Sequence, residues 1–115
     1  MPYNDLRAGR WSEPGREYIV TTVTLHRRRV FWDFTCARIF IKHLARLDEE
    51  NTCTWLAWVL MPDHFHGLLR LDGDADLPTV MRFLKCRSGN AIGRHRGKPG
   101  GIWQSNYHDR ALRKE

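Results

Sequence analysis

The sequence predicts an α+β domain built on one antiparallel sheet with its helices on a single face. Two kinds of segment support this. Short stretches rich in β-branched and aromatic residues end at turn residues, and two longer stretches repeat apolar residues at three- and four-residue steps. Their order is strand, helix, strand, strand, helix, strand. That order is the split βαβ, or ferredoxin-like, arrangement, in which the second face of the sheet stays open to a partner.

The first strand is expected at residues 18–25, where six of eight residues are β-branched. A helix is expected at 35–50, with Thr35 as its N-cap. Its apolar stripe comprises Cys36, Ile39, Phe40, His43, Leu44 and Leu47.

Two strands, 54–61 and 64–71, should follow, joined by a Pro62-Asp63 turn. The first is apolar on both of its faces, which is typical of a central strand.

The second helix should begin near Asp76, with Pro78 in its first turn. Its pattern fades at residues 88–90, so it either breaks there or continues to Gly93. Residues 94–101 are expected to form a flexible basic loop, and residues 102–107 the last strand.

The composition indicates one small globular domain of 115 residues, with 42% apolar residues. Lys and Arg number 19 against 13 acidic residues, a net charge of +6 that favours polyanions, above all nucleic acid. A soluble domain that is merely basic is the alternative. Residues 1–17 are expected to be a loose arm without a secretory signal. No apolar run could span a bilayer, so a cytoplasmic location without membrane contact is expected.

The three cysteines are widely spaced, which argues against a disulfide framework. Cys36 and Cys86 fall at apolar helix positions, and we expect both to be buried as small apolar residues.

The tripeptide His64-Phe65-His66 opens an expected strand directly after a turn. Side chains alternate along a strand, so the two imidazoles should share one face and could together bind a divalent cation. Two half-buried histidines without a metal are the alternative. Asp63 could be a further ligand or could shape the turn, and His108 and Asp109 could approach from the last strand.

Basic residues gather in two clusters that could neutralise phosphates. One lies in the arginine run 27–29 and the other spans residues 82–98, which hold no acidic residue. The candidates are Arg27, Arg28, Arg82, Lys85, Arg87, Arg94, Arg96 and Lys98. A solvated helix face is the alternative. Trp11, Trp32 and Trp103 could stack on unpaired bases, although core packing is the commoner use of tryptophan.

These segments together resemble the IS200-like transposases, including the REP-associated tyrosine transposases of bacteria. The resemblance covers nearly the whole chain from Tyr18. Its motifs are Val20-Thr21-Thr22-Val23-Thr24 with Arg29 and Phe31-Trp32, then Met61-Pro62-Asp63-His64-Phe65-His66-Gly67-Leu68-Leu69, then the stretch from Ile102-Trp103-Gln104 through His108-Asp109-Arg110 to Arg113.

The resemblance implies an HUH endonuclease with one catalytic tyrosine, acting on single-stranded DNA near small hairpins in the bacterial cytoplasm, at the nucleoid. It implies that His64 and His66 hold Mg²⁺ or Mn²⁺ against the scissile phosphate. A tyrosine would attack that phosphate, and the covalent intermediate would conserve the bond energy for rejoining.

In the family, the nucleophilic tyrosine normally lies on a helix after the last strand, and the sequence stops at Glu115 without such a segment. We therefore expect residues 18–115 to be a domain truncated before the tyrosine helix, as a fragment or a decayed copy. Tyr107, in the last strand, is a poor candidate for the nucleophile. A non-catalytic module that binds single-stranded nucleic acid is the alternative, and the family includes both monomers and homodimers.

Overall fold

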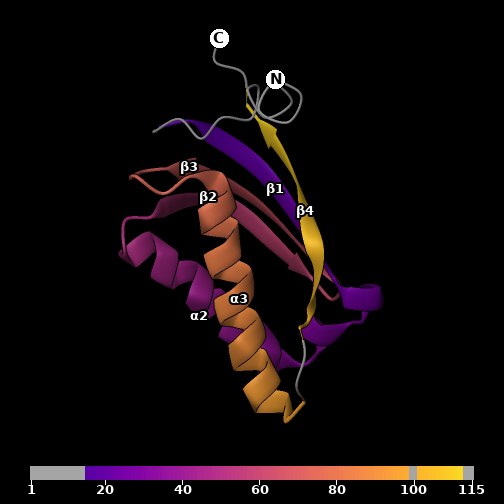
Figure 1. Cartoon of the computed structure of the whole chain (residues 1–115). Coiled ribbons are helices and arrows are strands. Elements are labelled where there is room, and N and C mark those ends of the chain that lie inside the picture. The colour runs from indigo at the N-terminus through magenta and orange to yellow at the C-terminus, as the bar shows by residue number, and fades with distance from the viewer. Residues whose placement is uncertain (1–14, 99–100, 113–115) are drawn as a thin grey trace.

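A computed structural model of the protein describes residues 15–98 and 101–112. Four strands and two long helices alternate in the expected order (Figure 1). In chain order the elements are β1 (Glu17–Thr24), the 3-10 turns η1 (Leu25–Arg27) and η2 (Val30–Trp32), α2 (Phe34–Glu49), β2 (Cys53–Met61), β3 (His64–Leu71), α3 (Leu77–Arg96) and β4 (Trp103–Ala111). The predicted α+β class is confirmed. Most of the expected arm falls outside the described residues, and Glu17, its last residue, opens β1.

The strands form one antiparallel sheet in the order β2-β3-β1-β4, which is the split βαβ topology. The strand predicted at residues 54–61 was expected to be central in the sheet. That expectation is wrong, because this strand, β2, lies at an edge. Its apolar pattern reflects exposed apolar side chains, among them Trp58, Val59 and Met61, each more than 40% exposed. The central strands are β3 and β1.

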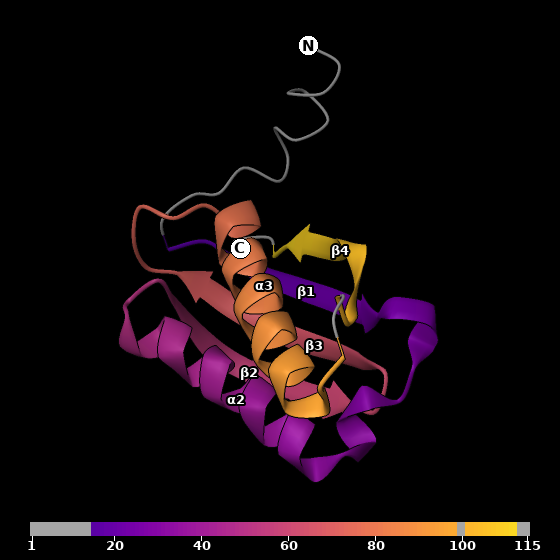
Figure 2. The same ribbon diagram turned by 60° about the horizontal axis from the view of Figure 1, so that its bottom comes forward.

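Both helices cover the same face of the sheet (Figures 1 and 2). The core lies between them and the sheet, where Phe40 of α2 meets Phe65 of β3 with ring centroids 4.9 Å apart. Strand β3 alternates strictly, since Phe65, Gly67, Leu69 and Leu71 are buried and the residues between them are not. The other face of the sheet is open over the described residues.

Helix α2 begins one residue earlier than expected, at Phe34, because Asp33 is the N-cap. The Asp33 carboxylate accepts a hydrogen bond from the Thr35 backbone N–H at 2.9 Å. The prediction of Thr35 as the cap is therefore wrong.

Helix α3 runs unbroken through residues 88–90 and ends at Arg96, three residues beyond the later of the two expected ends. The Ser88 hydroxyl donates to the Leu84 carbonyl and accepts from the Trp103 indole N–H at 3.1 Å, so this serine joins the helix to β4. Gly97 ends the helix in the left-handed conformation, at φ +64°. The flexible loop expected from residue 94 is thus partly helical, and β4 extends to Ala111, past the predicted end at 107.

The prediction that Cys36 and Cys86 are buried is confirmed only in part. Cys36 and Cys53 are buried, but Cys86 is exposed on α3, contrary to the expectation for that residue. In the described part of the chain, no helix is long and apolar enough to cross a membrane.

Candidate metal and nucleic-acid site

His64 and His66 begin β3 on the open face of the sheet. Phe65 between them points to the core, so the two imidazoles share the opposite face, as the alternation predicts. Their ring centroids lie 4.6 Å apart, with the rings nearly perpendicular. The local fold therefore brings two nitrogen ligands to one place.

The turn residue Asp63 orients His64. One carboxylate oxygen, Oδ1, lies 2.7 Å from His64 Nδ1, and the other, Oδ2, accepts from Arg27 Nε at 3.1 Å. The pKa of Asp63 is lowered, first by the hydrogen bond with His64 and then by Arg27, so the carboxylate is ionised at neutral pH. An ionised carboxylate can only accept, which places the His64 proton on Nδ1 and leaves Nε2 as the ligand atom.

Thr21 holds His66 from the neighbouring strand. The two residues are opposite each other in the β1–β3 register, and Thr21 Oγ1 lies 2.8 Å from His66 Nδ1. Desolvation and then the neighbouring His64 lower the pKa of His66, so its neutral, ligating form predominates at neutral pH. Nε2 is again the nitrogen left for a ligand.

The turn that carries Asp63 is fixed by the segment that follows β1. Thr24 donates to the Asp63 carbonyl through its backbone N–H at 2.9 Å and its hydroxyl at 3.0 Å. Phe31 N–H donates to the Pro62 carbonyl at 3.0 Å. His26 and Arg27 adopt positive φ angles between these anchors, which aims the Arg27 side chain at Asp63.

The donor set suits part of a divalent-cation site. Metal-bound histidines commonly give their second nitrogen to a carboxylate or another oxygen, as both do here. Within the described ranges, no third His, Cys, Asp or Glu side chain joins the pair at ligand distance. Asp63 uses one oxygen for His64 and the other for Arg27, so its geometry is that of an orienting group.

Comparison with known proteins identifies the family of this scaffold. The sequence profile described as "Transposase IS200 like" matches residues 15–111. The chain belongs to the IS200-like transposase family. No curated protein sequence matches it significantly.

Two solved transposase-related structures share the fold. One is a REP-associated tyrosine transposase bound to a REP hairpin, with a TM-score of 0.74 and 23% identity over 90% of this chain. This chain spans 60% of that structure's length. The other is a "putative transposase" from Deinococcus radiodurans R1, with a TM-score of 0.70 and 22% identity over 85% of this chain and 79% of that one.

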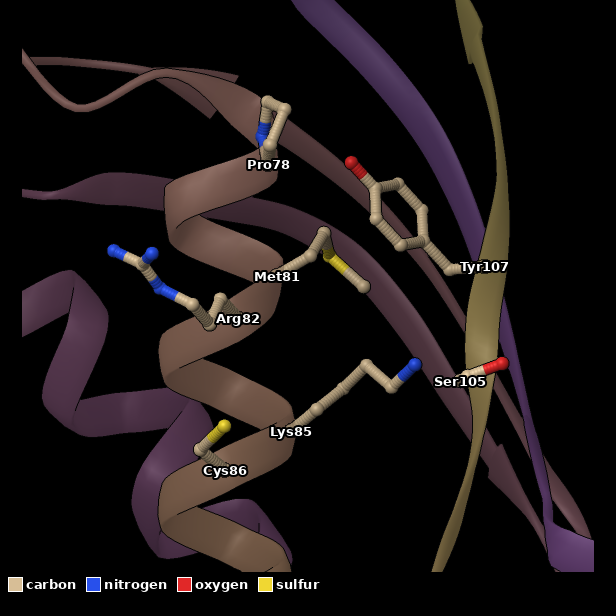
Figure 3. Close-up of a pocket in the computed structure, with 7 residues that line it drawn as sticks. All are labelled: Pro78, Met81, Arg82, Lys85, Cys86, Ser105 and Tyr107. Carbon is tan, nitrogen blue, oxygen red and sulfur yellow. The ribbon is translucent and has the colours of Figure 1, made fainter.

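In the present chain, Tyr107 lies on the opposite side of the sheet from the histidine pair. It pairs with the buried Thr22 and projects from β4 toward α3, over a cavity of about 190 Å³ (Figure 3). Its neighbour His108 instead faces the open side, opposite Thr21 and thus in line with His66. Asp109 shares the side of Tyr107, so of the expected contributors from the last strand only His108 shares the face of the pair.

The eight basic candidates fall into two groups. Three have partners within the protein: Arg27 pairs with Asp63, Arg87 with Glu50 at 2.9 Å, and Lys85 donates to the Gln104 and Asn106 carbonyls at 2.5 and 3.3 Å. Burial also lowers the pKa of Lys85. The remaining five are at least partly exposed. Arg28 lies near the Pro62-Asp63 turn that precedes His64, called the histidine turn below, because the Thr24 hydroxyl donates to the carbonyls of both Arg28 and Asp63. The others, Arg82, Arg94, Arg96 and Lys98, lie on or just after α3.

Of the three tryptophans expected to stack on bases, Trp32 alone is exposed in the described part of the chain. It is 69% exposed, and the Arg29 guanidinium lies 4.7 Å from its ring centroid. Trp103 is buried in the core, and Trp11 lies outside the described residues.

Sequence reasoning missed the roles of Thr21 and of the Arg27–Asp63 pair. A threonine in a β-branched strand gives no local signal, since its partner His66 is 45 residues away.

Proposed function

We propose that this chain binds single-stranded DNA and places one phosphate against a divalent cation held by His64 and His66, for strand cleavage and rejoining. One observation carries the proposal: the Nδ1 atoms of both imidazoles are engaged by oxygens, so both Nε2 atoms are left for a ligand. A pair of histidines oriented in this way is characteristic of metal sites. Membership of a transposase family supports a DNA partner.

Mg²⁺ or Mn²⁺ is the proposed cation, with water and DNA phosphate oxygens completing its coordination. Such a cation would stabilise the negative charge that develops on the phosphate oxygens. The protein contributes orientation: Asp63 fixes His64, Thr21 fixes His66, and Arg27 holds Asp63 in place.

The nucleophile is proposed to come from outside the described residues. Tyr18 is fully buried and Tyr107 faces α3, so neither lies on the face of the histidine pair, and Tyr3 falls among the residues not described. In the family that the sequence resembles, this tyrosine lies on a helix after the last strand, and the nucleophile is proposed to come from such a helix.

DNA is proposed to approach the histidine turn along the open face. Arg28 and the stacked Arg29–Trp32 pair lie just beyond β1, beside the segment that anchors this turn. They offer a charge for phosphate and an aromatic face for an unpaired base. The exposed cations of α3 would then contact more distant parts of the strand.

A second candidate function is a non-catalytic module that binds single-stranded DNA. The placement of Tyr18 and Tyr107 away from the histidines favours it, because a metal-bound phosphate without a nucleophile is bound and not cleaved.

The test uses single-stranded DNA hairpins with 3′ and 5′ flanks, a matched duplex control, and Mn²⁺. The proposal predicts tighter binding to the hairpin than to the duplex, with the preference reduced in His64→Ala/His66→Ala. A covalent adduct on denaturing gels would establish cleavage, whereas binding without an adduct would select the non-catalytic module. If the intact chain and the His64→Ala/His66→Ala variant each bound hairpin and duplex equally well, both the cleavage function and the non-catalytic single-strand-binding function would be refuted.

A further inference from the structure

A second cluster of metal-binding side chains lies on the helix side of the sheet, where the first turn of α2 meets the last turn of α3. It comprises Asp33, Cys36 and His95, whose ligand atoms all lie within 4.8 Å of one another. We propose that these three residues bind a thiophilic divalent cation, with Zn²⁺ as the expected ion, and that the ion clamps the two helices together.

The spacing is close to that of a zinc site. Zinc bonds of about 2.0–2.3 Å in tetrahedral geometry place ligand atoms about 3.3–3.8 Å apart. The Asp33 Oδ2 to His95 Nε2 distance is already 3.5 Å. The other two separations are at most 4.8 Å, so neither has to shorten by more than about 1–1.5 Å to reach this range. A water molecule would take the fourth position.

The two oxygens of Asp33 have separate tasks. Oδ1 caps α2 through the Thr35 N–H, while Oδ2 faces His95. The cap fixes the carboxylate without using the oxygen that a metal would need. Cys36 sits in the first turn of the same helix, where the helix dipole favours an anionic ligand.

The protonation of Cys36 and the charges around the cluster determine how favourable metal binding is there. Burial, and then the nearby Asp33 carboxylate, raise the pKa of the Cys36 thiol to about 11, so it is protonated without a metal. Zn²⁺ would displace this proton, and a thiolate with a carboxylate would balance the charge of the ion. Arg96 is close enough to lower the thiol pKa and so would oppose the cation.

Ligand chemistry separates this site from the histidine pair. Only this cluster offers a thiolate, and thiolate with imidazole selects zinc and similar ions. The competing explanation is a hydrogen-bonded cluster that links the helices without any metal, since the Cys36 thiol and His95 both contact Asp33. The two explanations differ in whether a metal binds through sulfur.

The test is cobalt(II) titration, because cobalt replaces zinc and gives a near-ultraviolet charge-transfer band only when a thiolate is a ligand. His64→Ala/His66→Ala serves as the background, so that the result does not depend on the proposed function. The inference predicts a saturable thiolate band that Zn²⁺ abolishes by competition. The band should be lost in Cys36→Ser and persist in Cys86→Ser, the matched control on an exposed cysteine.

His95→Asn keeps the test decisive if Cys36→Ser fails to fold, because the His95 side chain is 38% exposed and tolerates replacement. This variant should weaken cobalt binding at least tenfold and remove the Zn²⁺-induced rise in the thermal midpoint, expected to be about 5 °C at saturation. Absence of a thiolate band in the background protein, or a band that survives both changes at the cluster, would overturn the inference.

Discussion

The two faces of the sheet differ in what their residues do, although they alternate along the same strands. On β3, Phe65 packs against Phe40 in the core, while His64 and His66 on either side of it face outward. On β4, Tyr107 faces α3, while His108 faces outward opposite Thr21. On these two strands, the covered side chains therefore stabilise the fold, and the outward ones include the histidines available to a ligand.

This division implies that stability and ligand binding can be changed independently. The histidines rest on a strand that is buried on one side, and their orientation depends on hydrogen bonds made at the surface. Substitutions on the covered face should lower the free energy of unfolding, and those on the open face should lower affinity.

Phe65→Ala should have the largest effect. This fully buried ring contacts Phe40 and Trp55, and its loss should lower the free energy of unfolding by about 3–5 kcal/mol. Denaturant unfolding measures the change. The control is Val59→Ala on the open face, where the side chain is 47% exposed and the expected cost is under about 1 kcal/mol. Similar costs for the two variants would contradict the division of faces.

Gly67→Ala should also destabilise the protein. An added Cβ would lie 2.7 Å from Trp55 and 2.8 Å from the Phe65 ring, so the aromatic side chains must shift. The expected cost is about 1–3 kcal/mol in the same assay. Gly101→Ala is the control, since a Cβ added at Gly101 would meet no atom within 4 Å. An unchanged stability for Gly67→Ala would show that the covered face is looser than described.

Asp63→Asn should affect the open face without unfolding the protein. An amide cannot hold both His64 and Arg27 by charge, so Mn²⁺ affinity should fall about 10–100-fold with little change in the thermal midpoint. Titration calorimetry measures the affinity, with Asp74→Asn, an exposed turn residue of equal charge, as the control. Equal affinities in the two variants would remove Asp63 from the site.

Arg94→Ala/Arg96→Ala should have the smallest effect, on nucleic-acid binding alone. Losing two cations should reduce the slope of log affinity against log salt by about one to two units for single-stranded DNA. The control is Arg46→Ala, since Arg46 is paired with Glu50. A slope that changes equally in both proteins would exclude a specific role for the end of α3.

The sequence predicts the covered face well, because burial imposes a regular period. The order of the elements, the helix start at Asp76 and the shared face of His64 and His66 all follow from local spacing.

The position of β2 at an edge of the sheet could not be predicted, since an exposed apolar strand and a buried one have the same sequence pattern. Where the pattern of α3 fades, Ser88 bonds to Trp103 across the fold, a contact that local spacing does not reveal. The Thr21–His66 contact and the Asp33, Cys36 and His95 cluster likewise join residues far apart in sequence.

The most direct test of the central claim is Mn²⁺ titration calorimetry on the intact chain and on His64→Ala/His66→Ala. If the two oriented imidazoles hold the cation, the intact chain should show saturable uptake at one site, and the double variant should lose it while keeping its circular dichroism spectrum and thermal midpoint. Undiminished uptake by the double variant, or no uptake by either protein, would contradict the account.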